Sequence, residues 1–253
     1  MDVLARRNPH ERDSHISFQD EGHIYTIDGD TDFMSVTTWI HKHFKPFDAD
    51  KIIQGMMARK SWSNSRYFGQ TPEQIKTGWE ANRDEAATAG TKLHYDIECY
   101  YNGWHRNNDS AEYQYFLNFA QKNAGLVPFR TEWLIWDKEL RFAGSIDMVF
   151  FNPNGSLMIY DWKRSKGIEK GNGWGDFATT ECVSHLPDSN YWHYSLQLNT
   201  YKALVERNYG YKVSDMMLVC FHPNHKDYQV FAVPDLSAEV DALFDLRKKM
   251  LDK

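Results

Sequence analysis

Residues 129–163 read FRTEWLIWDKELRFAGSIDMVFFNPNGSLMIYDWK, and this stretch decides the fold. The hydrophobic period changes here from helical to strand-like, and we expect strands over 129–137, 141–151 and 156–163. Short turns separate these segments, at Lys138-Glu139 and at Pro153-Asn154-Gly155. Because short turns join antiparallel neighbours, the stretch predicts an antiparallel meander of three strands.

Helical segments and two further strands surround this meander. Upstream, Thr71-Pro72-Glu73 fits a helix start, the clearest long helix is expected over 79–101, ended by Asn102 and Gly103, and another is expected over 110–124. Downstream, residues 164–189 form a loop that is long for a compact domain. After the loop we expect a helix over 191–208, strands near 215–222 and 227–233, and a last helix that starts at Asp235, with Ser237 as an alternative cap.

The N-terminal third is expected to be a small hairpin followed by helices. Residues 16–27 alternate around a polar turn and predict the hairpin. Short helices are expected over 35–43, with Ser35 as cap, and from Asp48 to about residue 60. The whole pattern predicts an α/β fold with a central mixed β-sheet flanked by helices and an N-terminal helical subdomain. We divide the chain into an N-terminal hairpin and helical segment (1–78) and a core domain (79–253).

Composition narrows the function classes. The chain has 253 residues, 42% of them hydrophobic and 25% charged, which suits a soluble globular protein. Its net charge of -6 is mild evidence against nucleic-acid binding, although a carboxylate site for a divalent metal is itself acidic. The three cysteines form no CxxC pair, so we expect neither zinc nor an iron–sulfur cluster. With no membrane-spanning run and no signal peptide, we expect an intracellular, reducing compartment (cytoplasm or nucleus) and no membrane partner.

Two strands of the meander carry carboxylates suited to chemistry. Side chains alternate along a strand, so Asp161 and Lys163 share one face and Trp162 points to the other. Asp147 lies inside an apolar strand, where an unpaired carboxylate is costly. The strands are expected to be adjacent, so Asp147 and Asp161 could converge on one ion. The alternatives are a solvated strand end for Asp161 and Lys163, and backbone donors for Asp147.

Two helices offer further polar pairs at a spacing of four residues. On a helix, His94 and Glu98 share a face, as do Gln197 and Tyr201. His94 is a candidate third ligand beside the two aspartates, with a structural histidine as the alternative. Gln197 and Tyr201 could hold a substrate phosphate, since both have hydrogen-bonding groups, or could be plain helix-surface residues.

Together these residues resemble the PD-(D/E)XK nuclease superfamily, and within it the RecB-like exonuclease branch. Its four short motifs are matched in order, over roughly residues 80–233, by Gly90 to His94, Gly144 to Asp147, Asp161 to Lys163, and Gln197 to Tyr201. The proline usual before the first aspartate is replaced by Ile146, and the cluster-binding cysteines of some relatives are absent. The segment 35–51 is similar to that of stand-alone nucleases of large DNA viruses, phages and mitochondria.

The resemblance implies a restriction-endonuclease-like core and a division of labour in the site. His94, Asp147, Asp161 and the carbonyl of Trp162 would bind one or two Mg²⁺ or Mn²⁺ ions, which favour oxygen ligands. Lys163 would position the attacking water, as orienter or as base, and Glu98 would assist a second metal. Gln197 and Tyr201 would hold the substrate backbone. Glu132, in the first strand, is either a residue that supports the ligands or half of a cross-strand salt bridge.

The expected substrate is DNA, single-stranded or with frayed ends. Basic and aromatic residues interleave over 36–83, which suits a groove for single strands or, alternatively, a solvated basic face over an aromatic core. Candidate contacts there and in the loop after the third strand are Lys42, Lys45, Arg59, Arg164 and Lys166. The rival functions are an RNA endonuclease, a non-catalytic nucleic-acid-binding module, and a structural protein with coincidental motifs. A helicase or recombination protein is a candidate partner.

Overall fold

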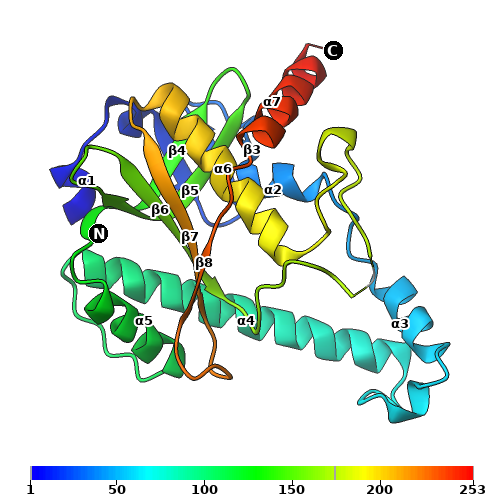
Figure 1. Ribbon diagram of the computed structural model, residues 1–253. Coiled ribbons are helices and arrows are strands. Elements are labelled where there is room, and N and C mark those ends of the chain that lie inside the picture. Colours follow the sequence, from blue (N-terminus) through cyan, green and yellow to red (C-terminus); the bar gives the residue numbers. More distant parts are fainter. Residues whose placement is uncertain (1, 174, 253) are drawn as a thin grey trace. The chain divides into compact units, whose positions relative to one another are not determined.

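A computed structural model describes residues 2–173 and 175–252 (Figure 1). The chain forms two compact units, one made of the residues up to Lys45 together with Leu93 onward, the other of Pro46–Lys92. The larger unit holds both β-sheets, and the smaller unit is helical. The domain boundary that we placed after Gly78 from the sequence lies inside helix α4 (Pro72–Tyr101), and residues of this helix belong to both units.

The central sheet is mixed and has six strands in the order β3-β5-β6-β7-β8, with β4 beside β5. The predicted meander is confirmed: β4 (Val127–Asp137), β5 (Phe142–Phe151) and β6 (Leu157–Arg164) pair antiparallel in sequence order. Strand β7 (Val213–Phe221) joins β6 in parallel, and β8 (Gln229–Ala232) pairs antiparallel with β7. The short β3 (Met34–Ser35), which the sequence did not predict, pairs in parallel with the start of β5.

Helices cover both faces of the sheet, as predicted for the α/β class. On one face, α6 (Asn190–Asn208), α7 (Ser237–Leu251) and α2 (Val36–His41) share an apolar core with the sheet, and Figure 1 shows α6 lying along the strands. On the other face, α5 (Ala111–Lys122) and the C-terminal part of α4 pack on β5, β6 and β7. Successive side chains along a strand therefore pack into two separate cores, one on each face of the sheet.

The N-terminal segment adds a small second sheet. Helix α1 (Val3–Arg7) and a 3-10 helix (Glu11–His15) precede the predicted hairpin, which is confirmed as β1 (Ile16–Gln19) and β2 (Ile24–Ile27). Tyr25 and Ile27 of β2 pack against β4 and β5 through Trp136 and Ala143. This packing places the hairpin against the meander.

Helix boundaries account for the remaining differences from the sequence prediction. Helix α4 begins at Pro72, at the helix start that Thr71-Pro72-Glu73 predicts, and continues without a break through the stretch expected to begin at residue 79. The side chain of Thr71 accepts a hydrogen bond from the backbone of Gln74, in the manner of an N-cap. Helix α7 begins at Ser237, and Asp235 lies outside it, accepting hydrogen bonds from the Ser237 backbone and hydroxyl. In the smaller unit, α3 (Ala49–Met57) starts as predicted behind its cap Asp48, and a 3-10 helix (Trp62–Asn64) follows.

Among the residues that the structure describes, none of the helices has the length and apolar character that a membrane span requires. The three cysteines are free thiols.

Candidate active site

The site forms where strands β5 and β6 separate. Their ladder runs from the Phe151–Leu157 pair to the Met148–Tyr160 pair and stops there. Beyond it, the backbone N–H of Trp162 donates to Oδ2 of Asp147 at 2.8 Å, and the Trp162 carbonyl lies 2.9 Å from Nε2 of His94. Two side chains thus satisfy the backbone groups that the ladder leaves unpaired, which buried strands require.

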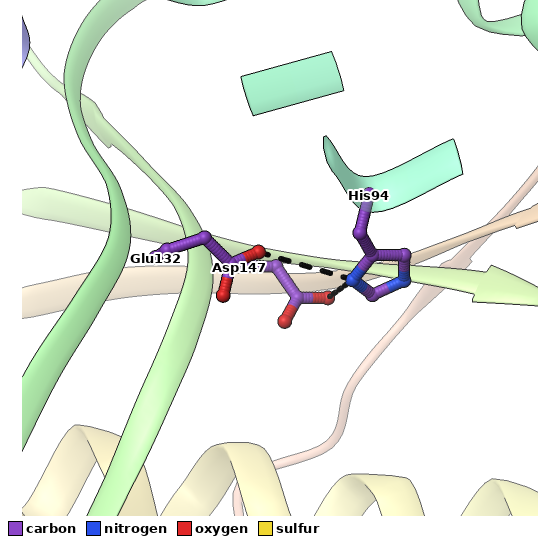
Figure 2. Close-up of side chains that lie close together, drawn as sticks. All are labelled: His94, Glu132 and Asp147. Atoms are coloured by element: carbon purple, nitrogen blue, oxygen red, sulfur yellow. Dashed lines mark ion pairs between the residues drawn. The ribbon is translucent and has the colours of Figure 1, made fainter. Parts of the chain in front are cut away.

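The contact with Trp162 indicates which ring nitrogen of His94 carries hydrogen. A carbonyl can only accept, so Nε2 carries the proton and, in the neutral ring, Nδ1 carries a lone pair. Nδ1 lies 3.6 Å from Oδ2 of Asp147 and 3.9 Å from Oε1 of Glu132, and Figure 2 shows it directed at both carboxylates. A histidine whose second nitrogen donates to a carbonyl is the usual arrangement of a metal ligand.

Glu132 is the residue that sequence reasoning undervalued. It lies on β4 between Thr131 and Trp133, which pair with Met148 and Ile146, so it stands opposite Asp147. Its φ of 43° is left-handed, a strained conformation for a residue with a side chain, and the Ser145 hydroxyl donates to its Oε2 at 2.9 Å. The carboxylate is turned towards Asp147, so the cross-strand arrangement is one of like charges. A glutamate facing an aspartate across the predicted meander was the signal available in the sequence.

His94, Glu132 and Asp147 form a group that could hold a metal ion. One ligand atom from each residue lies within 4.8 Å of the others. The set of two carboxylates and an imidazole suits a divalent cation that accepts oxygen and nitrogen ligands. Of the sequence-predicted ligands, His94 and Asp147 belong to this group, and Asp161 and the Trp162 carbonyl border it.

The electrostatics of the site favour added positive charge. Burial, followed by the charge of Asp147, raises the pKa of Glu132 above its ordinary value. Burial also raises the pKa of Asp161, an effect that Lys163 opposes and Asp147 reinforces. The phenol of Tyr25 on β2 responds to the same field, since burial and then Glu132 and Asp147 raise its pKa. A cation among these carboxylates would relieve their mutual repulsion.

Lys163 and Asp161 form an ion pair on the α6 face of β6. Lys163 Nζ lies 2.7 Å from Asp161 Oδ2 and 4.4 Å from the ring centroid of Tyr194 on α6. Trp162, between them in the sequence, packs into the core under α5 on the opposite face. Burial opposes the charge on Lys163, but the carboxylates of Asp161 and Asp147 outweigh burial and raise the pKa of the lysine. The ammonium is therefore a fixed donor beside the carboxylates.

Gln197 and Tyr201 lie one helical turn apart on α6. Nε2 of Gln197 donates to the Tyr201 hydroxyl at 3.0 Å. Tyr201 is 3% exposed and its ring lies against Gly144 of β5, where a Cβ atom would be 2.6 Å from Cε1 of the ring. The glycine of the Gly-x-x-Asp element is therefore explained by packing, because a side chain at this position would collide with the Tyr201 ring. Gln197 is only partly buried, so it is the member of the pair with access to solvent.

The other predicted residues have separate surroundings. Glu98 follows His94 by one turn of α4, is half-buried, and has a pKa raised by burial, but it is not in the metal-binding group. Arg164 is occupied by a nearly buried ion pair with Glu112 of α5, 2.7 Å between Nε and Oε1. Lys45 pairs with Asp176 of the long loop. The last three candidate substrate contacts are exposed: Lys42, Arg59 and Lys166. Their predicted substrate contacts stay predictions.

Comparison with known proteins adds little to this geometry. No protein-family model and no curated protein matches the chain. Similar solved structures include one described as "Putative exonuclease" from Eubacterium rectale, 10% identical, covering 87% of this chain and 79% of that one with a TM-score of 0.46. Another is the protein SSO0001, 14% identical, covering 88% of this chain and 77% of that one with a TM-score of 0.37. At these scores the likenesses carry no argument about function, which depends on the site itself.

Proposed function

We propose that this protein is a metal-dependent nuclease that hydrolyses phosphodiester bonds. The observation that carries the proposal is the convergence, at the point where β5 and β6 separate, of the His94, Glu132 and Asp147 donors beside the Asp161–Lys163 pair. The side chains come from α4 and three successive strands, so the fold itself assembles the site. The order of the four motifs, which resembles the RecB-like branch of the PD-(D/E)XK superfamily, supports the same function.

The chain's own residues would divide the work of hydrolysis. His94, Glu132 and Asp147 would hold Mg²⁺ or Mn²⁺, with Asp161 as the further carboxylate ligand predicted from sequence. The Trp162 carbonyl, the other ligand predicted from sequence, instead accepts from Nε2 of His94, on the side of the ring away from Nδ1. When bound, such a cation lowers the pKa of a coordinated water and offsets charge on the phosphate. The raised pKa values of Glu132 and Asp161 fit this role, because they show that negative charge is disfavoured at these carboxyl groups until a cation offsets it.

Lys163 has the properties of an orienting donor. Asp161 and Asp147 raise its pKa against the effect of burial, so in the metal-free site the ammonium is charged and is placed to donate to the attacking water or to a phosphate oxygen. Tyr194 and Asp161 restrict where the ammonium can lie. Gln197, fixed by the Tyr201 hydroxyl, offers its amide to the substrate backbone. In the reaction the water oxygen joins the phosphorus and gives up a proton to solvent, the bond to the leaving oxygen breaks, and that oxygen takes up a proton from solvent.

The expected substrate is DNA, and the expected action is exonucleolytic on single-stranded or frayed ends, in an intracellular setting with a helicase or recombination protein as partner. This part of the proposal rests on the motif resemblance and on the basic and aromatic residues of 36–83. The 2′-hydroxyl distinguishes RNA from DNA, so an RNA endonuclease would show a ribose-dependent preference.

Cleavage of end-labelled strands tests the proposal. Single-stranded DNA, duplex DNA and RNA are incubated with Mg²⁺, Mn²⁺ or EDTA, using wild type and Asp161→Ala. We expect metal-dependent cutting of DNA that the variant loses, with a ladder of products shortened from one end. Binding without cutting in any metal would identify a non-catalytic module instead, and equal cutting by the variant would exclude this site.

A further inference from the structure

The smaller unit contains a cavity of about 370 Å³ with aromatic walls and no assigned role. Four of its lining residues come from α4 at helical spacing, Phe47 precedes α3, and Ala49 is the first residue of α3. The four α4 residues share one face of the helix, because they stand at positions i, i+3, i+4 and i+7: Lys76, Trp79, Glu80 and Arg83.

Two aromatic rings form the walls of this cavity. Phe47 is 73% exposed, and its ring centroid lies 5.8 Å from that of Trp79 at an interplanar angle of 58°. The indole N–H of Trp79 donates to the Tyr67 hydroxyl at 2.8 Å, which holds the ring and satisfies its polar edge. A flat ligand would stack on one ring and meet the other along its edge. The exposed ring of Phe47 gives the cavity an apolar surface that is open to solvent.

Two cations and one carboxylate line the cavity. An ion pair between Lys76 and Asp50 joins α4 to α3, and Arg83, exposed at the rim, contacts its neighbour Asp84. The unit Pro46–Lys92 holds seven Lys and Arg against six Asp and Glu, whereas the whole chain has 29 against 35. Glu80 would repel a phosphate inside the cavity but can accept a hydrogen bond from an exocyclic amino group, so the interior favours a base.

We propose that the Phe47–Trp79 cavity is a stacking subsite for one nucleobase of a single-stranded nucleic acid, with the phosphates on either side held near Lys76 and Arg83. The proposal rests on the nuclease function, which requires the protein to recruit a strand. Stacking on aromatic rings tolerates any base and requires an unpaired one. The subsite therefore accounts for a preference for single strands over duplex, and it does not distinguish DNA from RNA.

Strand binding without metal tests this subsite. The full-length protein in EDTA is titrated into fluorescein-labelled oligothymidylate, its RNA counterpart, and an abasic strand of equal length, with fluorescence anisotropy as the readout. Variants are Phe47→Ala and Trp79→Ala. The matched control is Phe68→Ala, which removes another exposed ring of the same unit that does not line the cavity. Circular dichroism checks that each variant folds, and Phe47 is too exposed for its loss to remove core packing.

We expect wild type to prefer base-bearing strands to the abasic strand, and to bind DNA and RNA within a few-fold of each other. Phe47→Ala and Trp79→Ala should weaken binding to base-bearing strands about tenfold and Phe68→Ala should not, because stacking contributes about 1–3 kcal/mol per base. Wild-type affinity in Phe47→Ala, or equal binding of the abasic strand by wild type, would overturn the subsite. A base preference without any metal-dependent cleavage would refute the nuclease and leave the subsite standing.

Discussion

Replacing Gly144 with alanine should destabilise the protein, although the same change in an unobstructed strand would stabilise it. Alanine in a strand loses less backbone entropy than glycine, a gain of about 0.5–1 kcal/mol. At Gly144, however, the new Cβ would lie 2.6 Å from Cε1 and 3.2 Å from Cζ and Oη of Tyr201. Carbon atoms prefer separations of about 3.5–4 Å, so the ring or the strand must move by about 1 Å.

Because Tyr201 is buried, its ring cannot move away from the new Cβ atom without disturbing the core. Its ring is packed in the core between α6 and the sheet, and overpacking such a core costs about 1–3 kcal/mol. The net expectation for Gly144→Ala is a loss of about 1–2 kcal/mol in the free energy of unfolding, measured by urea denaturation. Metal-dependent cleavage should fall as well, because the displacement reaches Gln197 and Asp147.

A control and a second background make the reasoning refutable. Gly125 also lies outside the left-handed region, and a Cβ added there would meet nothing within 4 Å, so Gly125→Ala should be neutral or stabilising by up to about 1 kcal/mol. In a Tyr201→Leu background, Gly144→Ala should lose most of its cost, which a double-mutant cycle measures. If Gly144→Ala behaves like Gly125→Ala in the wild-type background, the close contact does not constrain the site.

Three further changes test other parts of the site and fold. Glu132→Gln should weaken Mn²⁺ binding at least about tenfold while the metal-free protein keeps its stability, measured by thermal melts with and without Mn²⁺; an unchanged metal-induced shift would exclude Glu132. Lys163→Met should slow cleavage at least about 100-fold and retain Mn²⁺ binding, and loss of binding would contradict an orienting role. Burial lowers the pKa of His43 to about 4 from 6.5, so the unfolded state binds the extra proton and stability present above pH 6.5 falls as pH drops towards 4, by up to about 3 kcal/mol. His43→Leu should flatten urea-derived stability over that range, and an unchanged slope would assign it to other groups.

The meander could be predicted because its signals are local. Alternation and turn residues lie within the stretch 129–163, so the antiparallel pairing of β4, β5 and β6 follows from neighbouring segments. Strand β3 has two residues and pairs in parallel with β5, more than a hundred positions along the chain. No local sequence pattern predicts a pairing over this separation. Helix α4 extends through Gly78 because neighbouring turns tolerate one glycine within a long helix.

The site residues also divide into those that a local sequence pattern predicts and those that it does not. Asp147 is conspicuous because it lies inside an apolar strand, and His94 is a candidate because the adjacent strands carry two carboxylates. The left-handed backbone of Glu132 has no sequence signature, and a glutamate in a strand is ordinarily half of a cross-strand ion pair. Arg164 was predicted to contact substrate from its position after Lys163, but its partner Glu112 lies on α5, on the other face of the sheet. An ion pair between residues far apart in the sequence therefore determines that Arg164 is already occupied.

The central claim is that a divalent cation binds at His94 and Asp147, beside Glu132 and the Asp161–Lys163 pair. Crystals grown with Mn²⁺ and measured at the manganese absorption edge would locate the ion directly from its anomalous scattering. We predict a peak about 2 Å from a ring nitrogen of His94 and from an Asp147 carboxylate oxygen, lost in Asp147→Ala. A map with no peak there, or with its manganese bound only at residues away from His94 and Asp147, would contradict the proposed site and with it the nuclease mechanism.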